Sequence, residues 1–227
     1  TRGSAISVGD EGGYAPNLFT NLDALEVISQ AVRHTGHQLN MDVFFGIDFA
    51  ASSFRKDHGY QIKDRPTEYT PNDFLTYLKD LYEKYRIILM EDAFAEDEWG
   101  SWANLTKTLG AQCLIVGDDL IVSNKKRLEK AISEHAVTAI VLKPNQIGTI
   151  TELLETLELA KSHDIKTIMS HRSGETNDSF IADLAVGLQT DYVKFGAPCR
   201  GERIAKYNRL LAIEGELAAA NQPAKSS

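Results

Sequence analysis

Charged residues end a series of apolar, strand-like runs along this 227-residue chain. The residues at the run ends are Asp48, Glu91, Asp118, Lys143, His171 and Lys194. From Glu91 onward, successive run ends lie 23 to 28 residues apart, which is the length of one strand, one crossover helix and two short loops. In a parallel α/β sheet or barrel, the groups that act on a ligand gather at the carboxyl ends of the strands. We therefore expect three carboxylates, two lysines and one imidazole at one rim, which favours an enzyme.

The three carboxylates predict a metal site. Like charges on neighbouring strand ends would repel one another without a counterion between them. All-oxygen ligation by Asp48, Glu91 and Asp118 suits a hard divalent cation, and it favours Mg²⁺ over Zn²⁺ because no Cys or His takes part. A lone aspartate at a strand end is more often a helix cap or a turn former, and this alternative stays open for Asp92 and Asp119.

The two lysines at run ends have different expected tasks. Lys143 follows four apolar residues, so the usual interpretation of a solvated lysine fits it less well than it fits Lys125 or Lys126. A second ammonium and a divalent cation beside Lys143 would favour its neutral amine, which makes it a candidate general base. Lys194 would instead hold negative charge on a substrate.

Two loops carry further candidate groups. In residues 170–176 (SHRSGET), Arg172 offers a planar fork that matches a carboxylate or phosphate, and Ser173 adds a hydroxyl donor. The alternative for this loop is a simple polar turn around its glycine. Residues 9–13 (GDEGG) must form a tight, shaped loop, and they lack the spacing of a phosphate-cradling motif. Within it, Glu11 is either a mobile acid or a solvated turn residue.

Composition limits the possible classes of protein. A net charge of -8 argues against nucleic-acid binding driven by bulk charge. No apolar run approaches the length of a membrane span, and no signal-peptide pattern opens the sequence. The two cysteines, Cys113 and Cys199, suggest reduced thiols in a cytoplasmic protein. With 43% hydrophobic residues, the chain is expected to form one α/β domain over residues 1–227.

Amphipathic segments between the strand runs predict helices. These segments are residues 21–36, 70–85, 123–135, 150–163, 178–188 and 203–217. The polar segment 52–70 contains Gly59 and Pro66, so we expect it to be a long surface excursion.

Several of these segments together resemble the enolase family. They are VGDEGGYAPN (8–17), MEDAFAEDEW (90–99), VGDDL (116–120), LKPNQIGT (142–149), SHRSGETNDSFIADLAVG (170–187) and GAPCRGERIAKYN (196–208). The resemblance implies the α/β barrel of the enolase C-terminal domain, which has an unusual β/β/α/α start and follows a smaller α+β domain. The chain would supply strands three to eight, an incomplete barrel with six of eight strands, without the N-terminal domain and the first two strands. Six strands cannot close an eight-stranded barrel, so we expect little activity from these 227 residues alone.

The resemblance also implies a reaction. Enolases (phosphopyruvate hydratases) carry out the Mg²⁺-dependent, reversible dehydration of 2-phosphoglycerate to phosphoenolpyruvate. By match, Asp48, Glu91 and Asp118 would hold one Mg²⁺, and a second Mg²⁺ would arrive with the substrate. Lys143 matches the base that removes the C2 proton, and Glu11 matches the acid that assists departure of the 3-hydroxyl group.

Four more residues match the family's substrate-binding positions. They are His171, Arg172, Ser173 and Lys194, expected around the phosphate and carboxylate of the substrate. Family members are cytoplasmic dimers or octamers, so a homo-oligomer is expected of the full-length protein. Ser53, Ala93 and Phe195 depart from the family pattern beside site residues, not on them.

Two alternatives remain from the sequence. One is an acid-sugar dehydratase or racemase of the same superfamily, although such a protein is not expected to carry both GDEGG and SHRSGET. The other is a non-catalytic binding module or a fragment that cannot turn over. The length of the open reading frame upstream of Thr1 would help to distinguish a piece of a complete enzyme from these alternatives.

Overall fold

The computed structural model describes residues 7–220. Its main sheet has the strand order β1-β4-β5-β6-β7-β8. These strands are β1 (Gly46–Asp48), β4 (Leu89–Glu91), β5 (Leu114–Gly117), β6 (Ala139–Leu142), β7 (Lys166–Ser170) and β8 (Tyr192–Lys194). The registers found for β1 with β4, β4 with β5, β5 with β6 and β7 with β8 are all parallel. The predicted six-stranded parallel α/β arrangement is confirmed.

The predicted strand ends are also confirmed. Each charged residue is either the last of its strand or the first after it: Asp48, Glu91 and Lys194 are last, and Asp118, Lys143 and His171 come directly after. The chain divides into two compact units, residues 17–167 and residues 1–16 with 168–227, so the division falls inside β7. The single domain expected over residues 1–227 stays a prediction.

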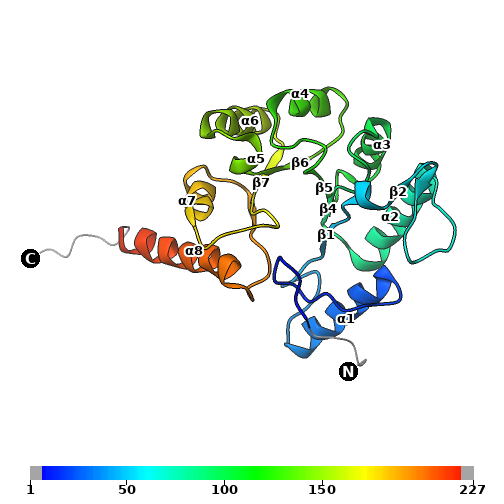
Figure 1. Ribbon diagram of the computed structural model, residues 1–227, viewed down its shortest axis with the longest axis horizontal. Coiled ribbons are helices and arrows are strands. Elements are labelled where there is room, and N and C mark those ends of the chain that lie inside the picture. Colours follow the sequence, from blue (N-terminus) through cyan, green and yellow to red (C-terminus); the bar gives the residue numbers. More distant parts are fainter. Residues whose placement is uncertain (1–6, 221–227) are drawn as a thin grey trace, which may run out of the picture. The chain divides into compact units, whose positions relative to one another are not determined.

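The larger unit alternates helices with strands β1 to β6. Its helices are α1 (Asn21–His34), α2 (Pro71–Tyr85), α3 (Trp99–Leu109), α4 (Lys125–Ser133), α5 (Pro144–Ile147) and α6 (Ile150–Ser162). Polar side chains fix the helix starts: Thr20 forms a capping box at α1, and Thr70 caps α2 just before a proline. In Figure 1, α3 lies beside β5 and α2, and α4 lies beside α6. The strand residues Ile115, Val116 and Ile140 are fully buried in this core.

Helix α3 was missed by the sequence analysis. Its sequence, WGSWANLTKTL, mixes Gly, Ser and Thr with apolar residues, and no side chain caps its start. Burial explains why the helix forms, because Trp102 and Leu105 are 0% exposed. The Trp102 indole also donates a 3.0 Å hydrogen bond to the carbonyl oxygen of Ala95. Tertiary packing therefore outweighs a weak local propensity.

Most residues of the segment 52–70, expected to form a surface excursion, are exposed, but the segment also contains regular structure. The segment 51–60 contains a short 3-10 helix, η1 (Ala51–Phe54), and a hairpin of β2 (Arg55–Lys56) and β3 (Gly59–Tyr60). Tyr60 is 0% exposed, and its ring stacks on Phe74 of α2 with the centroids 4.7 Å apart. One buried aromatic residue therefore anchors a segment whose composition is largely polar.

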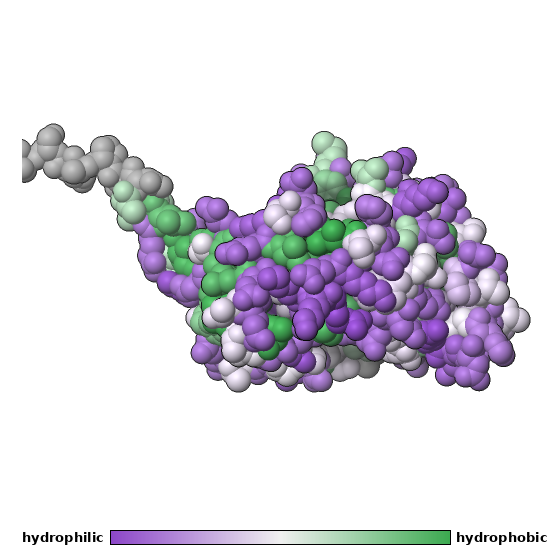
Figure 2. All heavy atoms as spheres, turned by 90° about the horizontal axis from the view of Figure 1, so that it is seen from above, coloured by the Kyte–Doolittle hydropathy of each residue, from purple (hydrophilic) through white to green (hydrophobic). Residues whose placement is uncertain are grey.

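The smaller unit contains β8, α7 (Phe180–Gly187) and α8 (Gly201–Ala220), with the two helices packed on each other. The loop 9–13 lies close to the segment after β8. A Cβ atom on Gly12, whose φ is +83°, would come within 2.8 Å of the Ala197 carbonyl oxygen. Figure 2 shows apolar side chains on the surface near the end of α8. Two apolar residues of this helix, Leu211 and Leu217, are exposed. In the described part of the chain, no helix is both long enough and apolar enough to cross a membrane.

Candidate active site

The three predicted carboxylates lie on or directly after three neighbouring strands of the larger unit. Asp48 of β1 and Glu91 of β4 are partners in the parallel register, and the backbone N–H of Phe49 donates to the Glu91 carbonyl oxygen at 2.9 Å. Asp118 comes directly after β5. Glu91 and Asp118 are buried, whereas Asp48 is exposed. The sequence predicted this placement because each of the three residues ends an apolar run, although only Glu91 and Asp118 belong to the regular spacing of 23 to 28 residues.

Asp92 shapes the turn that carries Asp118. Its Oδ1 accepts a 2.9 Å hydrogen bond from the backbone N–H of Asp118, and its Oδ2 accepts one of 2.9 Å from that of Asp119. Burial raises the pKa of Asp92 to about 7, although the two amide donors oppose that shift. Of the alternatives left open for Asp92, turn formation is the one that these contacts support. Asp92 therefore orients Asp118.

The carboxylates of this region fit a hard divalent cation. Asp92, Asp118 and Asp119 each offer one oxygen, and these oxygens lie within 4.8 Å of one another. This cluster shares only Asp118 with the predicted trio of ligands. Asp118 Oδ1 is buried and has no hydrogen-bond partner among the described residues, which is unusual for a carboxylate oxygen. Mg²⁺ prefers oxygen ligands, and carboxylates are the main protein groups that supply them. A buried carboxylate oxygen without a partner, with other carboxylates close by, therefore suits this ion.

Lys143 contacts the same carboxylate. Its Nζ forms an ion pair with Asp118 Oδ2, and the two side chains are only 13% and 9% exposed. Its backbone N–H donates to Ser123 Oγ at 2.8 Å, and that hydroxyl donates to Gln146 Oε1 at 3.0 Å. Ser123 is fully buried and was missed by the sequence analysis. The structure thus brings the candidate base into contact with a candidate metal ligand.

In the smaller unit, His171 lies between Lys194 and Glu11. The backbone N–H of His171 donates to the Lys194 carbonyl oxygen at 2.9 Å. The His171 side chain is 2% exposed, and its Nε2 lies 3.4 Å from Glu11 Oε2. Burial lowers the pKa of His171; Glu11 opposes the shift, while Arg203 and Lys194 add to it. The contact with Glu11 is an ion pair only when the imidazole is protonated, and the lowered pKa disfavours that form.

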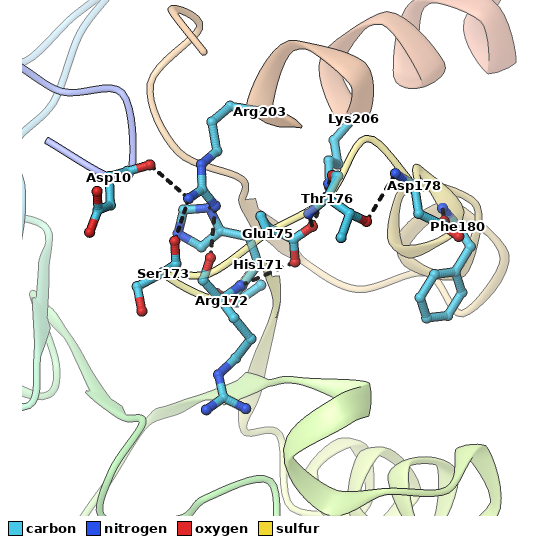
Figure 3. A network of polar contacts seen from close by, with 11 residues as sticks. Asp10, His171, Arg172, Ser173, Glu175, Thr176, Asp178, Phe180, Arg203 and Lys206 are labelled. Carbon is cyan, nitrogen blue, oxygen red and sulfur yellow. Dashed lines mark hydrogen bonds and ion pairs between the residues drawn. The ribbon is translucent and has the colours of Figure 1, made fainter. Parts of the chain in front are cut away.

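The loop that carries Arg172 and Ser173 is held through its backbone. The carbonyl oxygens of both residues accept hydrogen bonds from the Arg203 guanidinium, each at 2.7 Å. In Figure 3 the Arg172 side chain points away from α8 and from this network. Lys206, one turn further along α8, forms an ion pair with Glu175 and donates to the Thr176 carbonyl oxygen.

Arg203 and Lys206 were predicted only as part of a helix. Both side chains are buried, at 1% and 0% exposure, on the same face of α8. Two cations three residues apart at the start of an amphipathic helix are usually solvated, so composition gave no signal for their burial. Their presence in the GERIAKYN segment was the one available indication.

The predicted site residues thus form two groups, each within one unit. The larger unit holds Asp48, Glu91, Asp118 and Lys143, and the smaller unit holds Glu11, His171, Arg172, Ser173 and Lys194. Within these groups, the structure brings together Lys143 with Asp118, Asp48 with Glu91, and His171 with Glu11 and Lys194.

Comparisons with known proteins identify the family. Residues 1–226 match the family model described as Enolase, C-terminal TIM barrel domain. Over 212 residues, covering 93% of this chain and 50% of each relative, the chain is 50% identical to the enolases of Helicobacter acinonychis (strain Sheeba) and Helicobacter pylori (strain G27). It is 49% identical to the enolase of Helicobacter pylori (strain J99 / ATCC 700824) over the same length. The chain spans about half the length of these relatives. On this evidence, the chain belongs to the enolase family.

Proposed function

We propose that the protein containing this chain is a phosphopyruvate hydratase that reversibly dehydrates 2-phosphoglycerate to phosphoenolpyruvate. Identity of about half to named enolases supports the reaction class of the whole protein. Among the structural observations, the ion pair between Lys143 and Asp118 carries the proposal furthest. It places the amino group of the candidate base against a carboxylate suited to a divalent cation.

The proposed reaction divides between a base and an acid. The C2 proton of the substrate is weakly acidic because its removal adds negative charge beside a carboxylate. Lys143 Nζ would accept this proton and leave the electron pair of the C2–H bond on C2 and the adjacent carboxylate, from which it would form the C2=C3 double bond in the next step. Glu11 would give a proton to the 3-hydroxyl group as the C3–O bond breaks, so that water leaves.

Metal binding belongs to the same proposal. Asp48, Glu91 and Asp118 would hold one Mg²⁺, with Asp119 as a further oxygen donor of the cluster, and a second Mg²⁺ would enter with the substrate. When bound, Mg²⁺ would neutralise negative charge that develops on the substrate carboxylate. Asp92 would act indirectly, because both of its carboxylate oxygens already hold the turn of Asp118 in place.

Four residues of the smaller unit would bind the substrate's anionic groups. Arg172 and Ser173 would supply a guanidinium fork and a hydroxyl donor, and Lys194 would supply a positive charge. His171 would add a neutral hydrogen-bond donor near Glu11. We further infer that residues 1–227 are part of the catalytic barrel domain of a cytoplasmic homo-oligomer in which these groups act.

An assay of phosphoenolpyruvate formation tests the proposed function. The complete translated protein should form phosphoenolpyruvate from 2-phosphoglycerate when Mg²⁺ is present. Lys143→Ala should lower kcat by at least about 100-fold, the lower end of the usual contribution of general-base catalysis. Lys126→Ala, which changes an exposed lysine of α4, is the matched control and should leave kcat unchanged. An inactive wild-type protein would support a non-catalytic binding role instead.

A further inference from the structure

One buried guanidinium joins the two loops of the smaller unit that carry candidate catalytic groups. Arg203 Nη1 lies 2.9 Å from His171 Nδ1 and donates to the Arg172 carbonyl oxygen at 2.7 Å. Its Nη2 donates to the carbonyl oxygens of Asp10 at 2.8 Å and Ser173 at 2.7 Å. Figure 3 shows these bonds converging on Arg203 from both sides. The contact with His171 differs from the other three because the partner is a titratable ring nitrogen.

The chemistry of arginine fixes the role of that ring nitrogen. A guanidinium has only donors and stays protonated in proteins, so it cannot accept a hydrogen bond from an imidazole N–H. His171 Nδ1 must therefore present its lone pair to Arg203. In a neutral imidazole, a lone pair on Nδ1 places the single ring proton on Nε2. An Nδ1–H tautomer or an imidazolium would direct one N–H against another.

The opposite ring nitrogen faces the loop of Glu11. His171 Nε2 is buried and lies 3.4 Å from Glu11 Oε2, yet it forms no well-aligned hydrogen bond with any described residue. A buried N–H without a partner is uncommon in folded proteins. The N–H of His171 Nε2 is therefore available to donate a hydrogen bond to an oxygen atom next to the Glu11 carboxylate.

We propose that Arg203 is a positioning residue that fixes His171 as its neutral Nε2–H tautomer, so that His171 donates a hydrogen bond beside Glu11 and does not itself exchange protons. The tautomer follows from the contacts alone. The use of this donor in catalysis rests on the proposed function.

The charged groups around His171 agree with a neutral ring. Arg203 and Lys194 disfavour a proton on the ring, as does burial, whereas Glu11 and the backbone of Phe195 favour it. Burial is the largest of these effects, and the pKa of His171 is lowered. Both groups that favour protonation offer oxygen acceptors, and an Nε2–H can satisfy an oxygen acceptor without becoming charged.

Lys206 provides a matched comparison on the same helix. Like Arg203, it is a buried cation that holds the loop after β7, through Glu175 and the Thr176 carbonyl oxygen. Glu175 in turn accepts a 3.5 Å hydrogen bond from the backbone N–H of Arg172. Among the contacts found for Lys206, none involves the His171 ring. Loss of Lys206 should therefore disturb the loop without changing the tautomer.

Long-range ¹H–¹⁵N correlation spectra of the complete translated protein test the tautomer directly. The His171 signals are assigned by their disappearance in His171→Gln. In the wild-type protein at pH 7 we expect a pyridine-type shift for Nδ1 and a pyrrole-type shift for Nε2. An Nδ1–H pattern, or the matching shifts of an imidazolium, would overturn the assignment. A coupling across the hydrogen bond from Arg203 Nη1 to Nδ1 is expected, and it can be measured without any variant that might fail to fold.

Two variants distinguish control of the His171 tautomer by Arg203 from general support of the loop after β7. Arg203→Met removes the donor and should give a mixture of the two neutral tautomers, whereas Lys206→Met should keep the wild-type pattern. An unchanged pattern in folded Arg203→Met would remove the role of Arg203. If that variant does not fold, absence of the coupling in the wild-type protein would remove it instead.

Measurements of kcat in two His171 variants distinguish a role of His171 as a hydrogen-bond donor from a role in which it exchanges protons. The amide of glutamine can donate near the position of Nε2 but cannot carry a proton, so His171→Gln should retain at least about tenfold more kcat than His171→Ala. Equal losses in the two variants would show that His171 exchanges protons. An inactive wild-type protein with the expected tautomer would instead count against the proposed function alone.

Discussion

Lys143 and Asp118 form an ion pair between two largely buried side chains that follow adjacent strands, β6 and β5. Asp118 Oδ2 contacts the ammonium, while Oδ1 has no hydrogen-bond partner among the described residues. One carboxylate thus faces the candidate base with one oxygen and offers the other oxygen to a cation. The first prediction follows from this arrangement.

Mg²⁺ should raise the melting temperature of the complete translated protein in a concentration-dependent way. A ligand that binds only the folded state stabilises it by about 2.7 kcal/mol at 100 times its dissociation constant. Asp118→Asn and Glu91→Gln should each reduce this shift, because each removes a negative ligand oxygen. Asp97→Asn changes an exposed carboxylate and serves as the control. Calorimetric scans in which all three variants respond to Mg²⁺ like the wild type would contradict the metal assignment.

Asp92→Asn should destabilise the fold by about 1–3 kcal/mol, the range for leaving buried polar groups without a partner. Asn has one acceptor oxygen, so it cannot satisfy the backbone N–H groups of both Asp118 and Asp119. Denaturant unfolding without added metal measures the effect. Asp119→Asn, at an exposed side chain, should change the free energy of unfolding by less than about 0.5 kcal/mol. Equal effects of the two substitutions would show that Asp92 does not hold the turn.

His171 should make stability depend on pH between about 7.5 and 5.5. Its pKa is lower in the folded state than the ordinary value near 6.5, so the unfolded chain binds the proton more readily. The free energy of unfolding should therefore fall as pH is lowered through that value. The fall should be smaller in His171→Gln, whereas His58→Gln, at an exposed histidine, should behave like the wild type. Asp92, whose pKa is raised to about 7, titrates in all three proteins and cancels in the comparison. Identical pH profiles in wild type and His171→Gln would refute this prediction.

The sheet could be predicted because its signal is local and repeated. Each strand is a short apolar run followed by or ending in a charged residue, and from Glu91 onward the distance to the next run fits one helix, so Glu91 and Asp118 were placed correctly at the ends of β4 and β5. Helix α3 and the hairpin of β2 and β3 could not be predicted in the same way. Trp102 and Tyr60 hold them through contacts with residues distant in sequence or outside the element.

The site could be predicted as a set of strand ends but not as a set of contacts. The spacing of the strand runs predicts that Lys143 and Asp118 lie at the same edge of the sheet. Whether the two side chains form an ion pair depends on their rotamers, which the spacing does not predict. The metal ligands and the candidate base were inferred from the residues themselves, whereas the substrate and the choice of Glu11 as the acid came from the resemblance to enolases, because strand ends carry no information about a particular substrate. Arg203 and Lys206 were missed because burial of a cation depends on backbone carbonyls and a carboxylate supplied by distant loops.

Exchange of the C2 proton of 2-phosphoglycerate with solvent tests the division of roles between Lys143 and Glu11 most directly. In the complete translated protein with Mg²⁺, Lys143→Ala should stop this exchange, because the first proton transfer is lost. Glu11→Gln should keep the exchange but fail to form phosphoenolpyruvate, because the departing hydroxyl group lacks its acid. Exchange that survives in Lys143→Ala and is lost in Glu11→Gln would show that the base is Glu11 and contradict the account.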